Sequence, residues 1–227
     1  MKNALFALLL LFFSLSNAFS QTVPFEVELE EVNFPDLPAL HSFAFGEWDG
    51  KWVFLGGRSN GLHGFFPFSG FPVASANSYL WVVDGQTGES WSFDVNELPD
   101  ALAEPLLATN PQYVQQGKYL AIIGGYGKKK ANDDFVTHPT LLVVDLETLV
   151  PAIVGGGDPA GSFMLLQDER MRVCGGDMLR LGDYVYLVGG HDFAGLYNSS
   201  GAPTFIQTYT SEIRRFKIAL EDSSPIC

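Results

Sequence analysis

A short apolar run that stops at a pair of glycines occurs three times and constrains the fold more than any other feature of this chain. The three copies are residues 52–57 (WVFLGG), 120–125 (LAIIGG) and 185–190 (VYLVGG). The glycine pairs are Gly56 and Gly57, Gly124 and Gly125, and Gly189 and Gly190. Similarity at a nearly constant period, here 65 to 68 residues, indicates a repeat architecture.

The segments around these runs repeat as well. A tight-turn signal precedes each run, a long loop follows each glycine pair, and a second apolar strand follows the loop. The second strands are expected at residues 79–84, 140–145 and 211–218, and the first two end in Val-Val-Asp. Short runs rich in Val, Ile, Tyr and Trp predict strands buried on both faces. Glycine tolerates the positive φ or close backbone approach that the sharp end of such a strand requires.

A buried strand ending in Gly-Gly, a variable loop and a second strand closing on Asp together resemble a kelch repeat, one blade of a β-propeller. The match is to secreted bacterial propellers of the type found in the central domain of galactose oxidase, and it spans about residues 40–220. Kelch repeats are about 50 residues long, so these copies are longer, mainly in their loops. The family places a Trp after the second strand. Trp91 fits this pattern, whereas Val150 and Ala219 stand at that point in the other two copies.

The resemblance implies an all-β fold, a partial kelch-type propeller with about three four-stranded antiparallel blades. The predicted blades cover about residues 39–98, 105–150 and 170–220. In the first blade the strands are expected at 40–45, 52–55, 79–84 and 91–95. The Pro- and Gly-rich stretches 99–111 and 150–162 are expected to cross between blades, with a short helical turn at 100–107. Alternation in residues 25–29 predicts one half-exposed strand before the first blade.

Residues 1–20 read as a secretory signal peptide. Lys2 provides a positive start, residues 4–13 are apolar, and small residues before Gln21 fit a cleavage site near Ser20 and Gln21. The apolar run is shorter than the roughly 20 residues that span a bilayer. The mature domain, 21–227, is therefore expected in the periplasm or outside the cell, with no membrane span. The formal charge of the whole chain, −13, disfavours binding to nucleic acid.

The remaining motifs do not indicate a catalytic or metal site. Cys174 and Cys227 could form a disulfide in an exported protein or remain thiols. The histidines His41, His63, His138 and His191 lack metal-type spacing, and no set of Tyr, His and Cys matches a copper-radical site, so no metal or cofactor is predicted. No Gly-x-Ser-x-Gly elbow or phosphate-binding loop is present. A charged run at 128–130 offers a weak site for an acidic ligand.

The long loops 58–78, 126–139 and 191–208 should emerge on one face of the blades, and loops on a rigid scaffold are where binding residues collect. These loops are rich in aromatic side chains, which either stack on sugars or peptides or fold back to pack the loops. The predicted ligand-binding residues are Arg58, His63, Phe66, Tyr126, His191, Phe193 and Tyr197.

Three blades do not close a ring, because propellers have typically about four to eight. The chain is then the first part of a longer protein, which we favour from the sequence, or it pairs with another copy as a homodimer, or its last blade is frayed. The predicted function is a secreted, non-catalytic kelch-repeat module that binds a glycan or a protein on the loop face. The alternative is the propeller portion of a secreted carbohydrate-active enzyme whose remaining blades are missing.

Overall fold

The computed structural model describes residues 25–32, 34, 36–221 and 224–226, and the protein is predominantly β. The chain divides into two compact units, Met1–Asn33 and Phe34–Cys227. In the first unit residues 25–32 form no strand, so the prediction of a strand at 25–29 is wrong. The predicted signal peptide, 1–20, lies outside the described residues.

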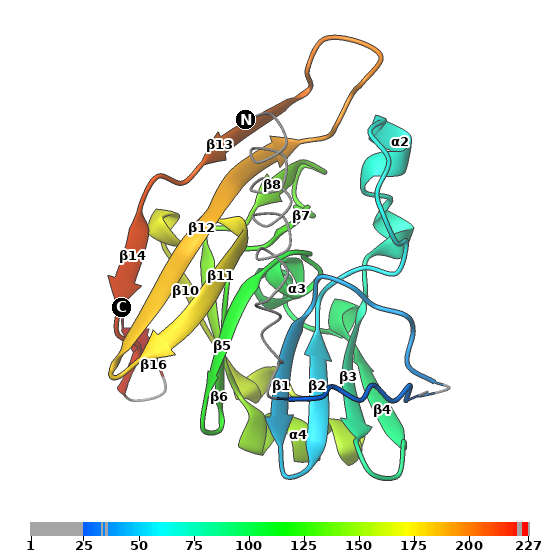
Figure 1. Ribbon diagram of the computed structural model, residues 1–227, viewed down its shortest axis with the longest axis vertical. Helices are drawn as coiled ribbons and strands as arrows, with labels where there is room; N and C mark the ends of the chain where they lie inside the picture. Colours follow the sequence, from blue (N-terminus) through cyan, green and yellow to red (C-terminus); the bar gives the residue numbers. More distant parts are fainter. Residues whose placement is uncertain (1–24, 33, 35, 222–223, 227) are drawn as a thin grey trace, which may run out of the picture. The chain divides into compact units, whose positions relative to one another are not determined.

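The first sheet is a four-stranded antiparallel meander in chain order (Figure 1). Its strands are β1 (Ala44–Trp48), β2 (Lys51–Leu55), β3 (Tyr79–Asp84) and β4 (Ser90–Asp94). The four predicted strands are confirmed, although β1 begins four residues later than expected. The β3–β4 turn is fixed by the Asp84 carboxylate, which accepts hydrogen bonds from the N–H groups of Gln86 and Thr87 at 2.9 Å.

The second sheet extends beyond its predicted limit of 150. Its strands, in the order β5-β6-β9-β10, are β5 (Gln112–Gln116), β6 (Tyr119–Ile123), β9 (Thr140–Asp145) and β10 (Phe163–Gln167). The helix α4 (Leu146–Val154) separates β9 from β10, so part of the predicted crossing at 150–162 is helical. The short helix α3 (Asp100–Leu106) confirms the predicted helical turn at 100–107.

The third sheet is irregular. Strand β11 (Cys174–Leu181) pairs with β12 (Tyr184–Gly195), and both β13 (Phe205–Tyr209) and β14 (Ile213–Phe216) pair with the other edge of β12. The third sheet is therefore three rows wide where four were predicted. Strand β12 also continues through Gly189 and Gly190, so this glycine pair does not end its strand as the other two pairs do. A small ribbon of β15 (Ala219–Glu221) and β16 (Ser224–Ile226) follows.

Short elements complete the described residues. They are α2 (Pro67–Gly70), β7 (Tyr126–Lys128), β8 (Phe135–Thr137) and the 3-10 helices η1 (Val73–Ser75), η2 (Val95–Glu97), η3 (Ala160–Ser162) and η4 (Glu169–Met171). The strands β7 and β8 form a hairpin inside the second long loop, for which no strand was predicted.

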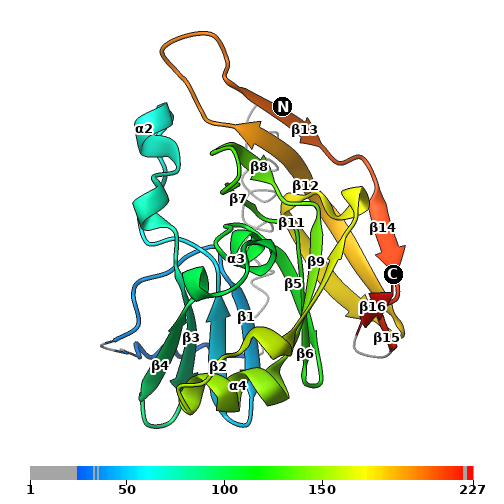
Figure 2. The same ribbon diagram turned by 180° about the vertical axis from the view of Figure 1, so that it is seen from behind.

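The three large sheets follow one another face to face, with the first strands β1, β5 and β11 as neighbours (Figures 1 and 2). One core cluster lies between the first and second sheets and includes Val53, Leu55, Leu120 and Leu142. The apolar side of α4 covers the same cluster. A second cluster lies between the second and third sheets and includes Ile123, Leu141, Val185 and Leu187. The second sheet is therefore buried on both faces, which explains its nearly continuous apolar strands.

All six glycines of the repeated pairs have positive φ, as predicted, with values between 64° and 87°. At the first glycine of two pairs there is also no space for a Cβ atom. A Cβ atom at Gly56 would lie 2.6 Å from the carbonyl oxygen of Ala108, and one at Gly124 would lie 1.9 Å from that of Val173. Both oxygens belong to the segment leading into the next sheet, so glycine here permits one sheet to approach the next.

Candidate binding face formed by the long loops

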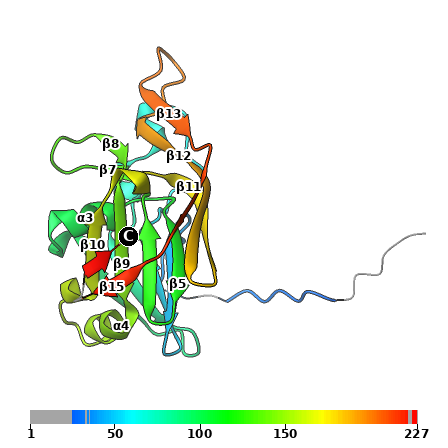
Figure 3. The ribbon, with the colours of Figure 1, turned by 90° about the vertical axis from the view of Figure 1, so that its left-hand side faces the viewer.

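The long loops meet at one end of the sheets, opposite the end where α4 lies (Figures 1 and 3). The first runs from Gly56 to Ser78 and contains α2, the second contains the β7–β8 hairpin, and the third connects β12 to β13. Side chains from different loops touch directly. His63 stacks on Tyr197 with ring centroids 5.2 Å apart, and Phe71 meets Tyr126 edge-on at 4.6 Å. The predicted convergence of the three loops is confirmed.

These rings form one aromatic cluster, defined here by His63, Phe65, Phe71, Tyr126, Phe135, Phe193, Tyr197 and Phe205. Three of its members, Phe71, Tyr126 and Phe193, are buried. The cluster therefore packs the loops onto the sheets, and two of the predicted ligand-binding residues, Tyr126 and Phe193, present almost no surface to a ligand.

Tyr126 is fixed by more than packing. Its hydroxyl donates a hydrogen bond to the backbone carbonyl of Gly195, which joins the second loop to the third at 2.5 Å. Burial raises the pKa of the Tyr126 phenol above its ordinary value, so this group stays protonated and keeps donating.

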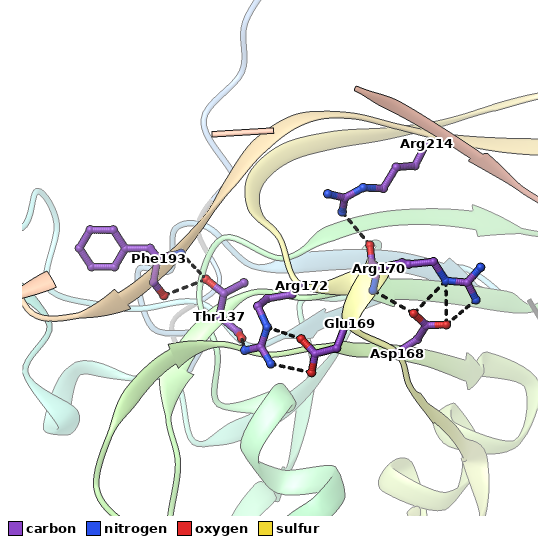
Figure 4. Close-up of polar contacts among 7 residues, drawn as sticks. All are labelled: Thr137, Asp168, Glu169, Arg170, Arg172, Phe193 and Arg214. Carbon is purple, nitrogen blue, oxygen red and sulfur yellow. Dashed lines mark hydrogen bonds and ion pairs between the residues drawn. The ribbon is translucent and has the colours of Figure 1, made fainter. Parts of the chain in front are cut away.

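A buried threonine holds the same two loops together (Figure 4). The Thr137 hydroxyl donates to the carbonyl of Phe193 at 3.0 Å and is placed to accept from its N–H at 2.9 Å. The Thr137 carbonyl in turn accepts from Arg172, whose guanidinium is paired with Glu169. Arg214 donates to the carbonyl of Arg170 in the same segment. These contacts anchor β8 and β12 below the aromatic cluster.

Arg58 lies at the edge of the cluster and is 5 % exposed. Its guanidinium lies over the ring of Phe71 and donates to the side chain of Asn60 and the carbonyl of Pro72. Burial lowers the pKa of Arg58 from its ordinary value. Within the described part of the chain no carboxylate forms an ion pair with this arginine. Buried cations are normally paired, so an arginine without an acidic partner is an unusual feature.

A cleft of about 380 Å³ opens beside Arg58, between the first and second loops. Its lining includes Ala76, Asn96 and Phe135, together with the charged residues Lys128, Lys130 and Asp133. The two lysines have acidic partners: Lys128 pairs with Asp133 at 2.7 Å, and Lys130 pairs with Asp100 at 2.8 Å. Arg58 is therefore the cation of this cleft whose charge is not neutralised by a neighbouring carboxylate.

Exposed aromatic side chains lie on the first loop. Phe66 and Phe68 stack on each other with centroids 5.5 Å apart, and they are 41 % and 81 % exposed. Phe65 is also exposed while its ring touches His63 and Tyr197. Of the predicted ligand-binding residues, Phe66 thus offers an open ring, and His63 and Tyr197 are half-buried.

His191 is separated from the cleft. It lies within β12, where its backbone pairs with Cys174 and Tyr209, and its ring packs against Tyr209 and Phe193. Burial lowers the pKa of His191 from its ordinary value. Cys174 is buried, and burial raises the pKa of its thiol to about 11. Cys227, with which it could form a disulfide, lies outside the described residues. No three His, Cys, Asp or Glu side chains in the described chain are grouped so as to hold a metal ion.

The sequence prediction missed Thr137 and Asn77, which organise the face from below. Asn77 is buried, and its side-chain NH₂ group donates to the carbonyls of Gly56 and Tyr79. Its side-chain oxygen accepts from the indole N–H of Trp81. A signal was available, because each residue lies within three positions of the start of the second apolar strand. A buried polar residue at that point requires hydrogen-bond partners.

The fold and the face together define a class: a predominantly β protein whose antiparallel sheets carry an aromatic loop face with a basic cleft. Comparison with known proteins adds no closer assignment, because no protein-family model and no curated protein matches this chain. Across the described residues, no helix is both long enough and apolar enough to cross a membrane.

Proposed function

We propose that this chain is part of a kelch-type β-propeller of a secreted protein and acts as a non-catalytic binding module. Its ligand is a glycan or a protein segment that carries a carboxylate, held on the face formed by the three long loops. The propeller assignment is supported by the succession of similar antiparallel sheets with their first strands side by side. It is also supported by the glycine pairs at equivalent points of the first two sheets.

The observation that carries the proposed function is the charge of Arg58. A guanidinium that is largely removed from water, lines a cleft and has no carboxylate partner among the described residues is stabilised by an anion that enters the cleft. Arginine suits this role because its planar fork can hold a carboxylate through two parallel hydrogen bonds.

The aromatic side chains of the first loop supply the second part of the site. Phe66 and Phe68 present open rings, and Phe135 lines the cleft beside Arg58. Open rings on the loop that carries Arg58 suit the apolar face of a sugar, or the side chains of an extended peptide, because both bury ring area while their polar groups stay hydrated.

Binding of matched acidic and neutral probes tests this function. Calorimetry with an oligogalacturonide, a neutral galacto-oligosaccharide of equal length and a short acidic peptide should give measurable affinity for an acidic probe. Arg58→Gln should weaken that affinity about tenfold or more, because a hydrogen bond to a charged group contributes about 1.5–3 kcal/mol. Phe68→Ala should weaken it without affecting folding, since that ring is exposed.

Arg180→Gln is the matched control, because Arg180 is an exposed arginine on β11, outside the cleft. It should leave affinity unchanged. Thermal unfolding of each variant separates lost binding from lost folding. Equal affinity for acidic and neutral probes, or full affinity in a folded Arg58→Gln protein, would show that the cleft is not an anion site.

A further inference from the structure

The two junctions between consecutive sheets are held by the same backbone hydrogen bond. At the first junction the N–H of Gly57 donates to the carbonyl of Ala108 at 2.9 Å, and at the second the N–H of Gly125 donates to that of Val173 at 3.0 Å. Each donor is the second glycine of its pair, and each acceptor precedes the first strand of the following sheet. The junction is therefore a repeated feature and does not depend on particular side chains.

A second set of bonds links the same segments. The N–H of Asn110 donates to the carbonyl of Ser42 at 3.0 Å, and the N–H of Gly175 donates to the carbonyl of Asn110 at 3.1 Å. All three residues have positive φ, between 53° and 64°. Ser42, Asn110 and Gly175 thus hold one unusual conformation at equivalent points of successive sheets, forming a ladder that passes from the first sheet to the third.

The third sheet carries the same glycine pair, and no atom of the described residues lies where the next sheet lies at the first two junctions. Gly189 and Gly190 match the other glycine pairs in sequence and in φ. A Cβ at Gly56 or Gly124 would strike the next sheet, whereas one at Gly189 would meet no atom of the described residues within 4 Å. The acceptor that Ala108 and Val173 supply to the first two sheets would have to come from a further sheet.

The side chains agree with the backbone. We call the face that a sheet turns toward the next sheet along the chain its forward face. Leu55 and Ile123, the residues before the first two glycine pairs, lie on forward faces and are buried against the following sheet. The equivalent Val188 is 36 % exposed, and its cross-strand partner Ile213 is 64 % exposed. Leu179, opposite Tyr186 on the same face, is exposed as well.

The first sheet carries the surface that would complete such a junction. Its opposite face, the rear face, holds Phe45, Trp52, Phe54 and Trp81, and Phe45 contacts both Trp52 and Phe54. By register these positions correspond to Tyr113, Leu120, Ile122 and Leu142, the residues with which the second sheet packs on the first. The backbone matches as well, because Leu40 occupies the position of the acceptors Ala108 and Val173, and Ser42 begins the ladder.

From these two halves we propose that the chain associates head to tail with a second copy of itself. The forward face of the third sheet in each copy docks on the rear face of the first sheet in the other. At this contact the Gly190 N–H of one copy donates to the Leu40 carbonyl of the second copy. The Ser42 N–H of the second copy donates to the Gly175 carbonyl of the first. A head-to-tail contact closes into a ring or continues into a filament. Two copies would supply twice the three sheets of one chain, within the range of about four to eight blades that propellers have.

Sedimentation of the full chain over a range of concentrations tests this association, and Gly189→Ala is the informative variant. The added Cβ would lie where the Leu40 carbonyl of the second copy docks, as it would at Gly56 and Gly124 in the junctions that already exist. The unchanged chain should sediment as a dimer, and Gly189→Ala should raise the dissociation constant at least tenfold. Val188→Glu, which places a charge on the forward face, should do the same.

Gly117→Ala is the matched control, since Gly117 has a φ of 56° and open space around it but lies in the β5–β6 turn, away from both faces. It imposes similar backbone strain and should leave the dimer intact. Hydrogen exchange provides a second readout: the Gly190 amide should be protected in the dimer to a degree comparable with the Gly57 and Gly125 amides. A monomer at every concentration, an open polymer, or a dimer that tolerates both Gly189→Ala and Val188→Glu would overturn the proposal.

Discussion

At the scale of single residues, the three long loops rejoin their sheets through one equivalent residue at the end of each loop. The backbone N–H groups of Asn77, His138 and Thr210 donate to the carbonyl of the second glycine of their repeat, at 2.9, 2.9 and 3.0 Å. The backbone contact is the same in all three repeats although the side chains differ. Of these side chains His138 is the one that titrates, and it is almost fully buried.

His138 should make the stability of the protein depend on pH. Burial, with smaller effects from Lys129 and Arg172, lowers its pKa from 6.5 to about 4. Between these values the unfolded chain binds a proton that the folded chain does not, so stability is complete above about pH 6.5 and falls as the pH drops toward 4. The loss is on the order of 3 kcal/mol. Urea unfolding of the native chain and of His138→Gln at several pH values should show a weaker pH dependence in the variant.

His63→Gln is a suitable comparison, because it removes a half-buried imidazole from the loop face. It should leave the acid-side loss of stability largely as it is in the native chain. An identical pH dependence in native and His138→Gln proteins would contradict the assignment of this loss to His138.

At the scale of elements, the same Val-Val-Asp ending leads to two different structures. After Asp84 the glycines Gly85 and Gly88 allow a tight turn to β4, whereas Asp145 caps the N-terminus of α4 by accepting from the N–H of Glu147. The repeat predicted a strand-to-strand turn in both copies. Leu146, Leu149, Val150 and Ile153 have helical spacing, but Pro151 within the run disfavoured a helix. The helix forms because these apolar residues are buried against the first core cluster.

The positive φ of the glycine pairs, by contrast, was predicted from the sequence. The loss of stability when one of these glycines is replaced can be measured. Gly124→Ala should destabilise the protein by about 3 kcal/mol or more, since the new Cβ would strike the Val173 carbonyl of the next sheet. Gly117→Ala, which has positive φ in open space, should cost only the roughly 1–2 kcal/mol of a left-handed backbone. Equal losses in denaturant unfolding would mean that conformation alone, and not the sheet junction, requires Gly124.

At the scale of the whole molecule, the sequence predicted the strands around the first two glycine pairs well because burial on both faces leaves a strong local signal. It could not predict which aromatic loop residues face solvent. Tyr126 and Phe66 are both aromatic residues of the long loops. Tyr126 is buried by contacts that include residues about 70 positions away, whereas the ring of Phe66 is exposed to solvent. The sequence prediction of four strand rows in the third sheet was wrong, because that sheet departs from the repeat in the length of β12 and in the pairing of β13 and β14.

This difference between sheets predicts an order of opening. The second sheet contributes to both core clusters, whereas the third contributes to one and leaves its forward face exposed. Regions with fewer buried apolar contacts open locally at lower free energy. In dilute solution, where a dimer would dissociate, native-state hydrogen exchange should therefore release amides of β12 and β14 at lower denaturant than amides of β6 and β9. At high concentration the head-to-tail contact should protect β12 and reduce the gap. Exchange from β6 and β12 at the same denaturant in dilute solution would show instead that all three sheets open as one unit.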